Sequence, residues 1–361
     1  MKIAIFHDYF GSIGGGEKLV LTLARALNAD VITTDVDAES MGKMDFNDVS
    51  MISLGETIKV PPFKQISASL RFAKCDFSKD YDFFIFSGNW AHYAARKHKP
   101  NLWYCHTPVR AFYDLRDFVI ENQKTPLHRI IAHIWIHVHG YFDQKMVKEV
   151  GKIVTNSRNT QARIHKYHNR NSTVIYPPVN VDEFRFTLNG DFWLSVTRLY
   201  PEKRVDLQIE AFRYLPEERL KIVGGFSRGD HAEGTIGYLL KDLPENVEFI
   251  GTVFEDELKR LYADCKAFIS TARDEDFGTA VVEAMAAGKP VVAVGEGGYL
   301  ESIVDGVTGR LVSSNVEDVA VAVREISKRP EKYRGACENR AKEFDISIFI
   351  ERMKEEMGIV P

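Results

Sequence analysis

Short apolar segments alternate with helical segments along nearly the whole chain, and this alternation constrains the fold most. Apolar strands are expected in the first half at residues 2–7, 30–34, 83–87, 102–105 and 152–155, with helices beginning near Gly16, Trp90 and Pro126. In the second half we expect strands at 192–197, 220–223, 247–250, 267–270 and 290–293, a helix at 204–213 and another from Asp256. Uninterrupted apolar strands between helices are typical of parallel sheets covered on both faces. The sequence therefore predicts an α/β protein.

The length and one proline pair predict two domains. A chain of 361 residues is long for one hydrophobic core and sufficient for two. Pro177 and Pro178 stand in segment 176–182, where two prolines would stiffen the chain and stop a helix. We therefore expect a first domain at 1–180 and a second at 181–345, followed by a helix with one apolar face at 346–357.

Composition excludes several classes of protein. The net charge of −4 gives no reason to expect a nucleic-acid partner. The four cysteines are scattered, without the spacing of metal ligands, which favours reduced thiols and a cytoplasmic protein. No apolar run reaches the roughly 18 residues of a membrane-spanning helix.

Segment 273–309 contains the pattern richest in binding chemistry. Glu275 and Glu283 stand eight positions apart around Phe277-Gly278, before an Ala-rich helix, an apolar strand and the glycine loop 295–298. Carboxylates accept hydrogen bonds from sugar hydroxyls, while a helix N-terminus and a glycine loop suit a diphosphate. The segment therefore predicts a pocket for a nucleotide sugar.

This segment resembles the E-x7-E signature of glycosyltransferase family 4, whose retaining members have the GT-B fold of two Rossmann-like domains facing a central cleft. The resemblance implies that Glu275 meets the donor sugar and Glu283 the nucleotide ribose, with Phe277, Gly278 and Thr279 also binding the donor. It also implies that segment 346–361 packs back on the first domain.

Two further segments carry the same resemblance on the donor side. In 195–206, Arg198 and Lys203 follow a strand and would offset charge on a departing nucleoside diphosphate. Their order resembles that of O-antigen and polysaccharide mannosyltransferases, although Thr197 replaces the usual glycine. Val253 and Phe254, after another strand, are candidates for the pocket of the base.

The first domain carries two candidate elements. Gly15, Gly16 and Glu17 resemble the GG-x-E element that lines the cleft. A dehydrogenase is the alternative, since Asp35 and Asp37 follow the next strand, but the glycine order is not G-x-G-x-x-G. His106, in the segment HTPVR, resembles the family's cleft histidine, and Arg110 is a candidate for an acceptor phosphate.

The resemblance implies transfer of a hexose, with mannose from GDP-mannose preferred, to a glycan or a polyprenyl-diphosphate-linked acceptor, without a metal or other cofactor. UDP-hexose donors and a non-catalytic nucleotide-sugar-binding protein remain alternatives. The helix beginning at Pro126, with Lys124, Arg129, Lys145 and Lys148 around it, would lie either on an anionic membrane or in the core.

Overall fold

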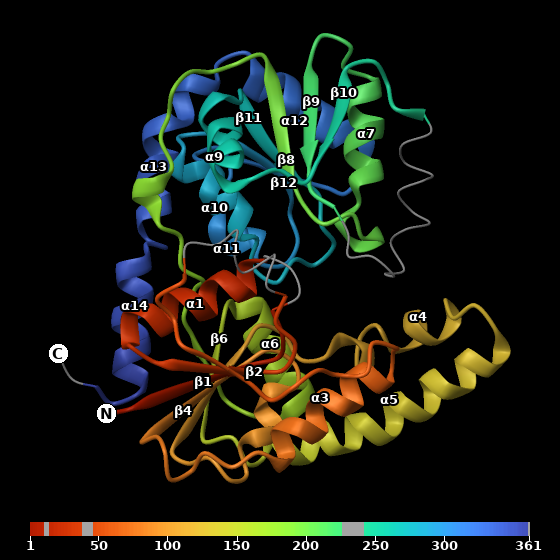
Figure 1. Ribbon diagram of the computed structural model, residues 1–361. Coiled ribbons are helices and arrows are strands. Elements are labelled where there is room, and N and C mark those ends of the chain that lie inside the picture. The colour runs from red at the N-terminus through yellow and green to blue at the C-terminus, as the bar shows by residue number, and fades with distance from the viewer. Residues whose placement is uncertain (11–13, 38–45, 226–241, 360–361) are drawn as a thin grey trace. The chain divides into compact units, whose positions relative to one another are not determined.

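The computed structural model describes residues 1–10, 14–37, 46–225 and 242–359, and the chain divides into two compact units. Unit 1 comprises Met1–Ile175 and Arg352–Pro361, and unit 2 comprises Tyr176–Glu351. Each unit contains a parallel sheet with helices packed on it (Figure 1). The predicted α/β class, with two Rossmann-like parallel-sheet domains, is confirmed.

The sheet of unit 1 has seven strands in the order β3-β2-β1-β4-β5-β6-β7, the order of a doubly wound sheet with one strand added. Its central strands are buried along their whole length because helices cover both faces. The strands are β1 (Ile3–His7), β2 (Asp30–Thr33), β3 (Met51–Ser53), β4 (Phe83–Ser87), β5 (Asn101–Cys105), β6 (Lys152–Thr155) and β7 (Thr173–Val174).

Helices pack on both faces of this sheet. The face that carries Phe6, Phe84 and Trp103 packs against α3, η1 and α5, and α1 lies on the other face (Figure 1). The helical elements are α1 (Gly15–Leu27), α3 (Phe63–Lys74), η1 (Ala91–Ala94), η2 (Arg110–Phe112), α4 (Arg116–Glu121), α5 (Pro126–Val147) and α6 (Arg158–His168), and α14 (Ile346–Glu356) ends in this unit.

One connection differs from its prediction. The expected helix near Trp90 is only the short 3-10 helix η1. The backbone N–H groups of Asn89, Trp90 and Ala91 all donate to the buried carboxylate of Asp8, which follows β1. This carboxylate satisfies the first N–H groups of the connection and fixes the turn between β4 and η1.

Unit 2 has six strands in the order β10-β9-β8-β11-β12-β13. They are β8 (Phe192–Val196), β9 (Arg219–Val223), β10 (Val247–Gly251), β11 (Ala267–Ser270), β12 (Val291–Val294) and β13 (Gly309–Val312). The helical elements are η3 (Val181–Glu183), η4 (Pro201–Lys203), α7 (Val205–Arg213), α9 (Glu255–Asp264), α10 (Thr279–Ala286), α11 (Tyr299–Ser302), α12 (Val316–Ser327), η6 (Pro330–Tyr333) and α13 (Arg334–Lys342).

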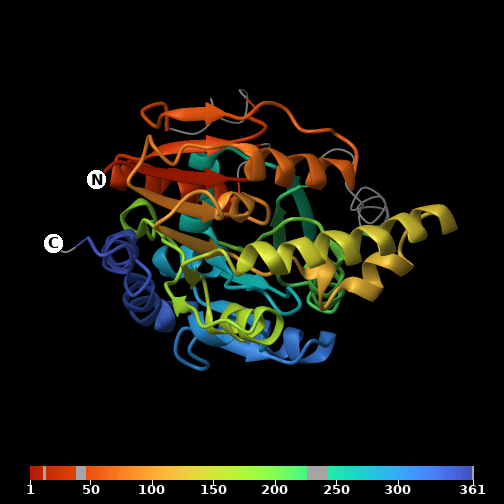
Figure 2. The same ribbon diagram turned by 90° about the horizontal axis from the view of Figure 1, so that it is seen from below.

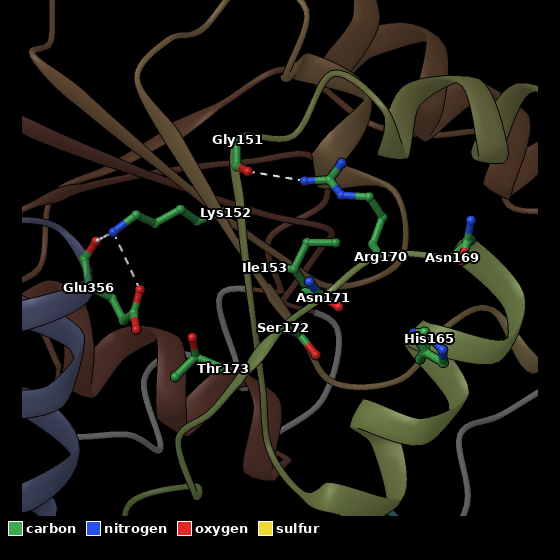
Figure 3. Close-up of a pocket in the computed structure, with 10 residues that line it drawn as sticks. All are labelled: Gly151, Lys152, Ile153, His165, Asn169, Arg170, Asn171, Ser172, Thr173 and Glu356. Carbon is green, nitrogen blue, oxygen red and sulfur yellow. Dashed lines mark hydrogen bonds and ion pairs between the residues drawn. The ribbon is translucent and has the colours of Figure 1, made fainter.

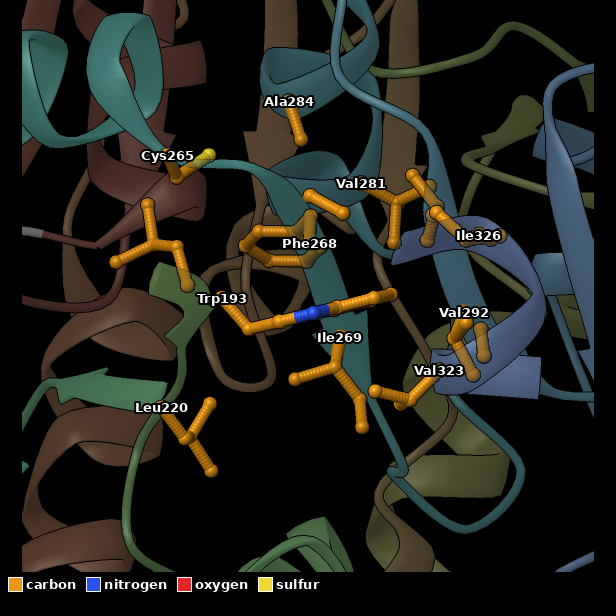
Figure 4. Packing of buried hydrophobic residues seen from close by; sticks show 14 of the residues in the cluster. Trp193, Leu220, Cys265, Phe268, Ile269, Val281, Ala284, Val292, Val323 and Ile326 are labelled. Carbon is orange, nitrogen blue, oxygen red and sulfur yellow. The ribbon is translucent and has the colours of Figure 1, made fainter. Parts of the chain in front are cut away.

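The core of unit 2 is a continuous apolar cluster between its sheet and helices. Trp193 and Phe268 of the central strands belong to this cluster (Figure 4). So do Val281 of α10 and, from α12, Val323 and Ile326. Burial on this scale, at about 25 cal/mol per Å² of apolar surface, holds the loops at the strand ends in place. Among the described residues, no helix is long and apolar enough to cross a membrane.

Candidate functional site

Most donor candidates of unit 2 follow the neighbouring strands β8 and β11, and the glycine loop follows β12, which is next to β11. Parallel strands end at the same edge of a sheet, and ligands of open α/β sheets bind at that edge. Backbone bonds join the loops there: Arg273 N–H donates to the Glu202 carbonyl at 2.7 Å, and Gly298 N–H donates to the Glu275 carbonyl at 2.7 Å. The structure thus brings segments about 100 residues apart into one surface.

Glu275 is held by two side chains on this edge. Lys203 Nζ lies 2.6 Å from Glu275 Oε2, and both side chains are partly exposed. The hydroxyl of Tyr299 lies 3.4 Å from the same oxygen and 2.5 Å from Ser270 Oγ. Burial, followed by the charge of Glu275, raises the pKa of Tyr299 well above its usual value, so the hydroxyl keeps its proton. A fixed carboxylate and an adjacent cation can bind a polyol and a phosphate together.

Glu283, in α10, is held by a tyrosine of α9. The hydroxyl of the fully buried Tyr262, in α9, donates to Glu283 Oε2 at 2.7 Å. Burial and the charge of Glu283 raise the pKa of Tyr262 well above its usual value. Tyr262 therefore orients the Glu283 carboxylate from the buried side.

A second ion pair supports the first. Arg204 Nη1 lies 2.9 Å from Glu296 Oε1, while Glu296 Oε2 accepts from the backbone N–H of Asp274 at 3.2 Å. Arg204 and Asp274 both have left-handed backbones, with φ of 48° and 49°. Sequence reasoning missed this pair and both tyrosines. Position was the one signal for Tyr299, which directly follows the glycine loop.

The glycines of this edge allow close backbone contact. A Cβ on Gly297 would lie 2.4 Å from the Glu275 carbonyl oxygen, and a Cβ on Gly278 would lie 2.5 Å from the ring of Tyr299. Gly278 has φ of +87° and directly precedes α10, whose first residue is Thr279. Only glycine satisfies both the backbone angle and the space at these two positions.

The remaining donor candidates differ in exposure. Arg198 is exposed in the loop after β8, and Phe254, 69% exposed, caps the start of α9, with Val253 partly buried beside it. Phe277 is 2% exposed and stacks on Tyr176. Its side chain therefore belongs to the core, and any donor contact of Phe277 is restricted to the backbone.

In unit 1, His106 follows β5 and lies at the carboxyl edge of its sheet. Its Nε2 lies 2.9 Å from the Oγ of Ser87, the last residue of β4, and its carbonyl accepts from Asn156, which follows β6, at 2.8 Å. Burial lowers the pKa of His106 to about 4. The neutral imidazole can therefore take part in hydrogen bonding at neutral pH.

Gly16 lies beside His106, in the first turn of α1. A Cβ at Gly16 would lie 3.7 Å from the imidazole, whereas a Cβ at Gly15 would meet nothing within 4 Å. Residues 11–13 of the same loop lie outside the described residues. Arg110 is paired with Asp114 at 2.6 Å, so an acceptor phosphate would have to share its guanidinium.

The dehydrogenase alternative finds no support at Asp35. Its carboxylate accepts from the backbone N–H of Thr57 at 3.0 Å, from the Thr57 hydroxyl and from Lys59. Asp35 thus joins two segments of unit 1. Within the described residues, no group of three or more His, Cys, Asp or Glu side chains is arranged to hold a metal ion.

A groove of about 690 Å³ lies elsewhere in unit 1, at the amino ends of β6 and β7 (Figure 3). The guanidinium of Arg170 donates hydrogen bonds to the carbonyls of Val147, Val150 and Gly151. Because the groove is at the edge opposite His106, and its arginine serves the backbone, it is separate from the candidate site.

Comparisons with known proteins agree with this geometry. The model of Glycosyltransferase Family 4 matches residues 13–183, and the model of Glycosyl transferases group 1 matches residues 178–344. The chain therefore belongs to the family 4-like glycosyltransferases with the GT-B fold.

Particular relatives are more distant. The alpha-1,3/1,6-mannosyltransferase ALG2 of Dictyostelium discoideum is 29% identical over 63% of this chain and 62% of its own length. A D-inositol 3-phosphate glycosyltransferase of Mycobacteroides abscessus is 29% identical over 56% of this chain and 49% of its own. The match thus spans about half to three-fifths of these relatives. The structure of Anabaena Alr3699/HepE in complex with UDP-glucose has a TM-score of 0.78 at 18% identity, over the full length of both chains.

Proposed function

We propose that the protein transfers a hexose from a nucleotide sugar to a hydroxyl group of a glycan acceptor. One observation carries the proposal: Glu275, Lys203 and the supporting Tyr299 come together at the carboxyl edge of unit 2's sheet. The site combines an acceptor of sugar hydrogen bonds with a cation for phosphate.

In the proposed reaction, the bond between the sugar's anomeric carbon and the diphosphate oxygen breaks, and a bond to the acceptor oxygen forms on the same face. The acceptor's proton passes to the departing phosphate. Lys203 and Arg198 offset the charge that develops on the nucleoside diphosphate. Glu275 orients the hexose and Glu283 the ribose. His106 and Arg110 remain predictions for contacts made by unit 1.

GDP-mannose is the proposed donor, and a polyprenyl-diphosphate-linked glycan the proposed acceptor. The mannosyltransferase relative supports mannose, whereas the UDP-glucose complex of a structural neighbour supports the rival UDP-hexose. Thermal stabilisation by GDP, GDP-mannose, UDP, UDP-glucose and NAD separates these donors. A ligand at 100 times its Kd adds about 2.7 kcal/mol, which raises Tm by several degrees. Stabilisation by NAD alone would contradict the proposal.

Glu275→Gln tests the site directly, and the chain provides a matched control. Glu218 pairs with Lys266 at 2.7 Å with similar burial, but at the amino ends of β9 and β11. We expect Glu275→Gln to lower transfer at least 100-fold while the fold survives. Glu218→Gln should lower stability and leave the kcat of transfer within about twofold. Equal transfer by both variants would remove Glu275 from the site.

We also propose that transfer needs no metal, because Arg198, Lys203 and the N-terminus of α10 would take the place of a divalent cation. Addition of EDTA in excess should leave the initial rate of transfer unchanged. Loss of activity that Mg²⁺ or Mn²⁺ restores would contradict this part of the mechanism alone.

A further inference from the structure

Helix α5 is apolar on two opposite faces, and only one of them is covered by unit 1. The covered face consists of Ala132, Ile136, His139, Asp143 and Val147. The other face is exposed and consists of Leu127 (64%), Ile130 (58%), Ile131 (36%), Ile134 (56%), Val138 (53%), Tyr141 (66%) and Phe142 (47%). These seven residues are called the α5 stripe.

The spacing makes the stripe continuous. Its members recur every three or four residues, so they share one side of a helix with 3.6 residues per turn. From Leu127 to Phe142 the stripe is about 22 Å long at 1.5 Å per residue. Single exposed apolar residues are ordinary on protein surfaces, but a contiguous patch of this extent marks an interaction surface.

The stripe is presented by a firmly held helix. Arg116 of α4 donates to His137 Nε2 at 2.7 Å. On the covered face, His139 accepts from the indole of Trp135 at 2.8 Å and stacks on Trp90 with ring centroids 4.9 Å apart. Both views show α4 and the first half of α5 extending from the sheet of unit 1 (Figures 1 and 2).

The exposed charges on α5 itself are all positive. Between Pro126 and Val147, the one carboxylate is Asp143, which is buried against His92. Exposed cations stand at the two ends of the stripe, with Lys124 before Leu127 and with Lys145 and Lys148 after Phe142. Arg129 is also exposed but lies on the opposite side of the helix. The exposed carboxylates nearby, Asp117 and Glu121, belong to α4. An anionic partner complements this surface, whereas pairing of two copies would bring the cations together.

We propose that α5 docks on an anionic lipid bilayer, lying in the plane of the interface with its stripe in the acyl boundary and its cations among the headgroups. An amphipathic helix binds bilayers through buried apolar area together with attraction to anionic lipids. The proposal goes beyond the proposed reaction and does not depend on it, because lipid binding needs neither the donor nor Glu275.

Vesicle flotation of the full chain without nucleotide tests the proposal. We expect binding to vesicles of phosphatidylglycerol and phosphatidylcholine, weaker binding to phosphatidylcholine alone, and weaker binding as salt rises. The variant Ile130→Gln/Ile134→Gln/Val138→Gln should lower the partition coefficient at least tenfold. Lys145→Gln/Lys148→Gln should lower it roughly fivefold per charge, for anionic vesicles only.

A matched control removes three equally exposed apolar side chains from unit 2: Leu188→Gln/Val307→Gln/Val321→Gln. This variant should bind vesicles as the unchanged protein does. Absence of lipid binding by the unchanged protein, or an equal loss in the control, would overturn the proposal. So would a dimer, seen by lipid-free sedimentation, that the stripe variant dissociates. Stabilisation by nucleotides, measured on the same variants, shows that their fold and donor site are intact.

Discussion

At the scale of single residues, Glu275 has the most closely controlled position in the candidate site. Lys203 Nζ contacts it at 2.6 Å, and the protonated hydroxyl of Tyr299 bridges it to Ser270. A ligand that draws Lys203 towards a phosphate would leave Tyr299 in contact with the carboxylate. Tyr299 is therefore a positioning residue for Glu275.

Tyr299→Phe should lower transfer about tenfold, because a hydrogen bond to a charged group contributes about 1.5 kcal/mol. Steady-state kinetics measure this effect as a fall in kcat/KM for the donor. Tyr333→Phe is the matched control, because Tyr333 is equally buried and its hydroxyl has no hydrogen-bond partner within the described residues. Similar losses in both variants would show that Tyr299 acts through packing alone.

At the scale of elements, the site depends on loops that contact each other through backbone. The glycine loop after β12 meets segment 274–277, and Gly297 has φ of +58° with the Glu275 backbone directly beside it. Gly306 has a similar φ of +73° but open space around its Cβ position. Alanine substitution at the two glycines therefore distinguishes the free-energy cost of a left-handed backbone from the cost of a steric clash.

Gly306→Ala should lower the free energy of unfolding by about 1 kcal/mol, the cost of a left-handed alanine. Gly297→Ala should cost at least about 2 kcal/mol more, because its Cβ would displace the loop that carries Glu275. Urea unfolding measures both values. Equal losses of unfolding free energy in the two variants would show that the loop after β12 shifts without cost to make room for the Cβ.

Element prediction succeeded where an apolar run was uninterrupted or a helix start was marked by a cap. The apolar runs predicted β4, β6 and β11 to the residue, and Thr125 with Pro126 marks the start of α5 as its cap and first residue. The strands β3, β7 and β13 were not predicted: β3 and β7 have only three and two residues, and β13 reads Gly-Arg-Leu-Val, in which Arg310 interrupts the apolar run. Such short strands have no readable periodicity and exist because a neighbouring strand pairs with them.

At the scale of the whole molecule, the two units differ in their response to acid. Every described histidine belongs to unit 1. Burial lowers the pKa of His7 to about 3 and those of His106, His139 and His168 to about 4. The pKa of Asp8 shifts in the opposite direction, because burial raises it to about 6.

A histidine with a lowered folded pKa stabilises the fold above the unfolded pKa of 6.5 and loses that contribution as pH falls towards 4. Asp8 stabilises the fold as pH falls through about 6, because its raised pKa favours the protonated form in the folded state. The combined loss from the four histidines is larger than this gain. From pH 7 to pH 5, unit 1 should lose on the order of 5 kcal/mol, and unit 2 much less. Amide hydrogen exchange at both pH values, corrected for intrinsic exchange rates, measures the unfolding free energy of each unit. Equal losses in both units would contradict this prediction.

The sequence by itself determined the architecture, because strand and helix periodicities are local and the apolar runs are continuous. It also placed Glu275, Glu283, Arg198 and Lys203 after strands whose carboxyl ends share an edge. The tertiary structure alone decided which polar groups meet. Lys203 and Glu275 are 72 residues apart, and the order of strands in the sheet joins them. It also decided which apolar face of α5 is covered, because two apolar faces of one helix are equivalent until the sheet packs against one of them.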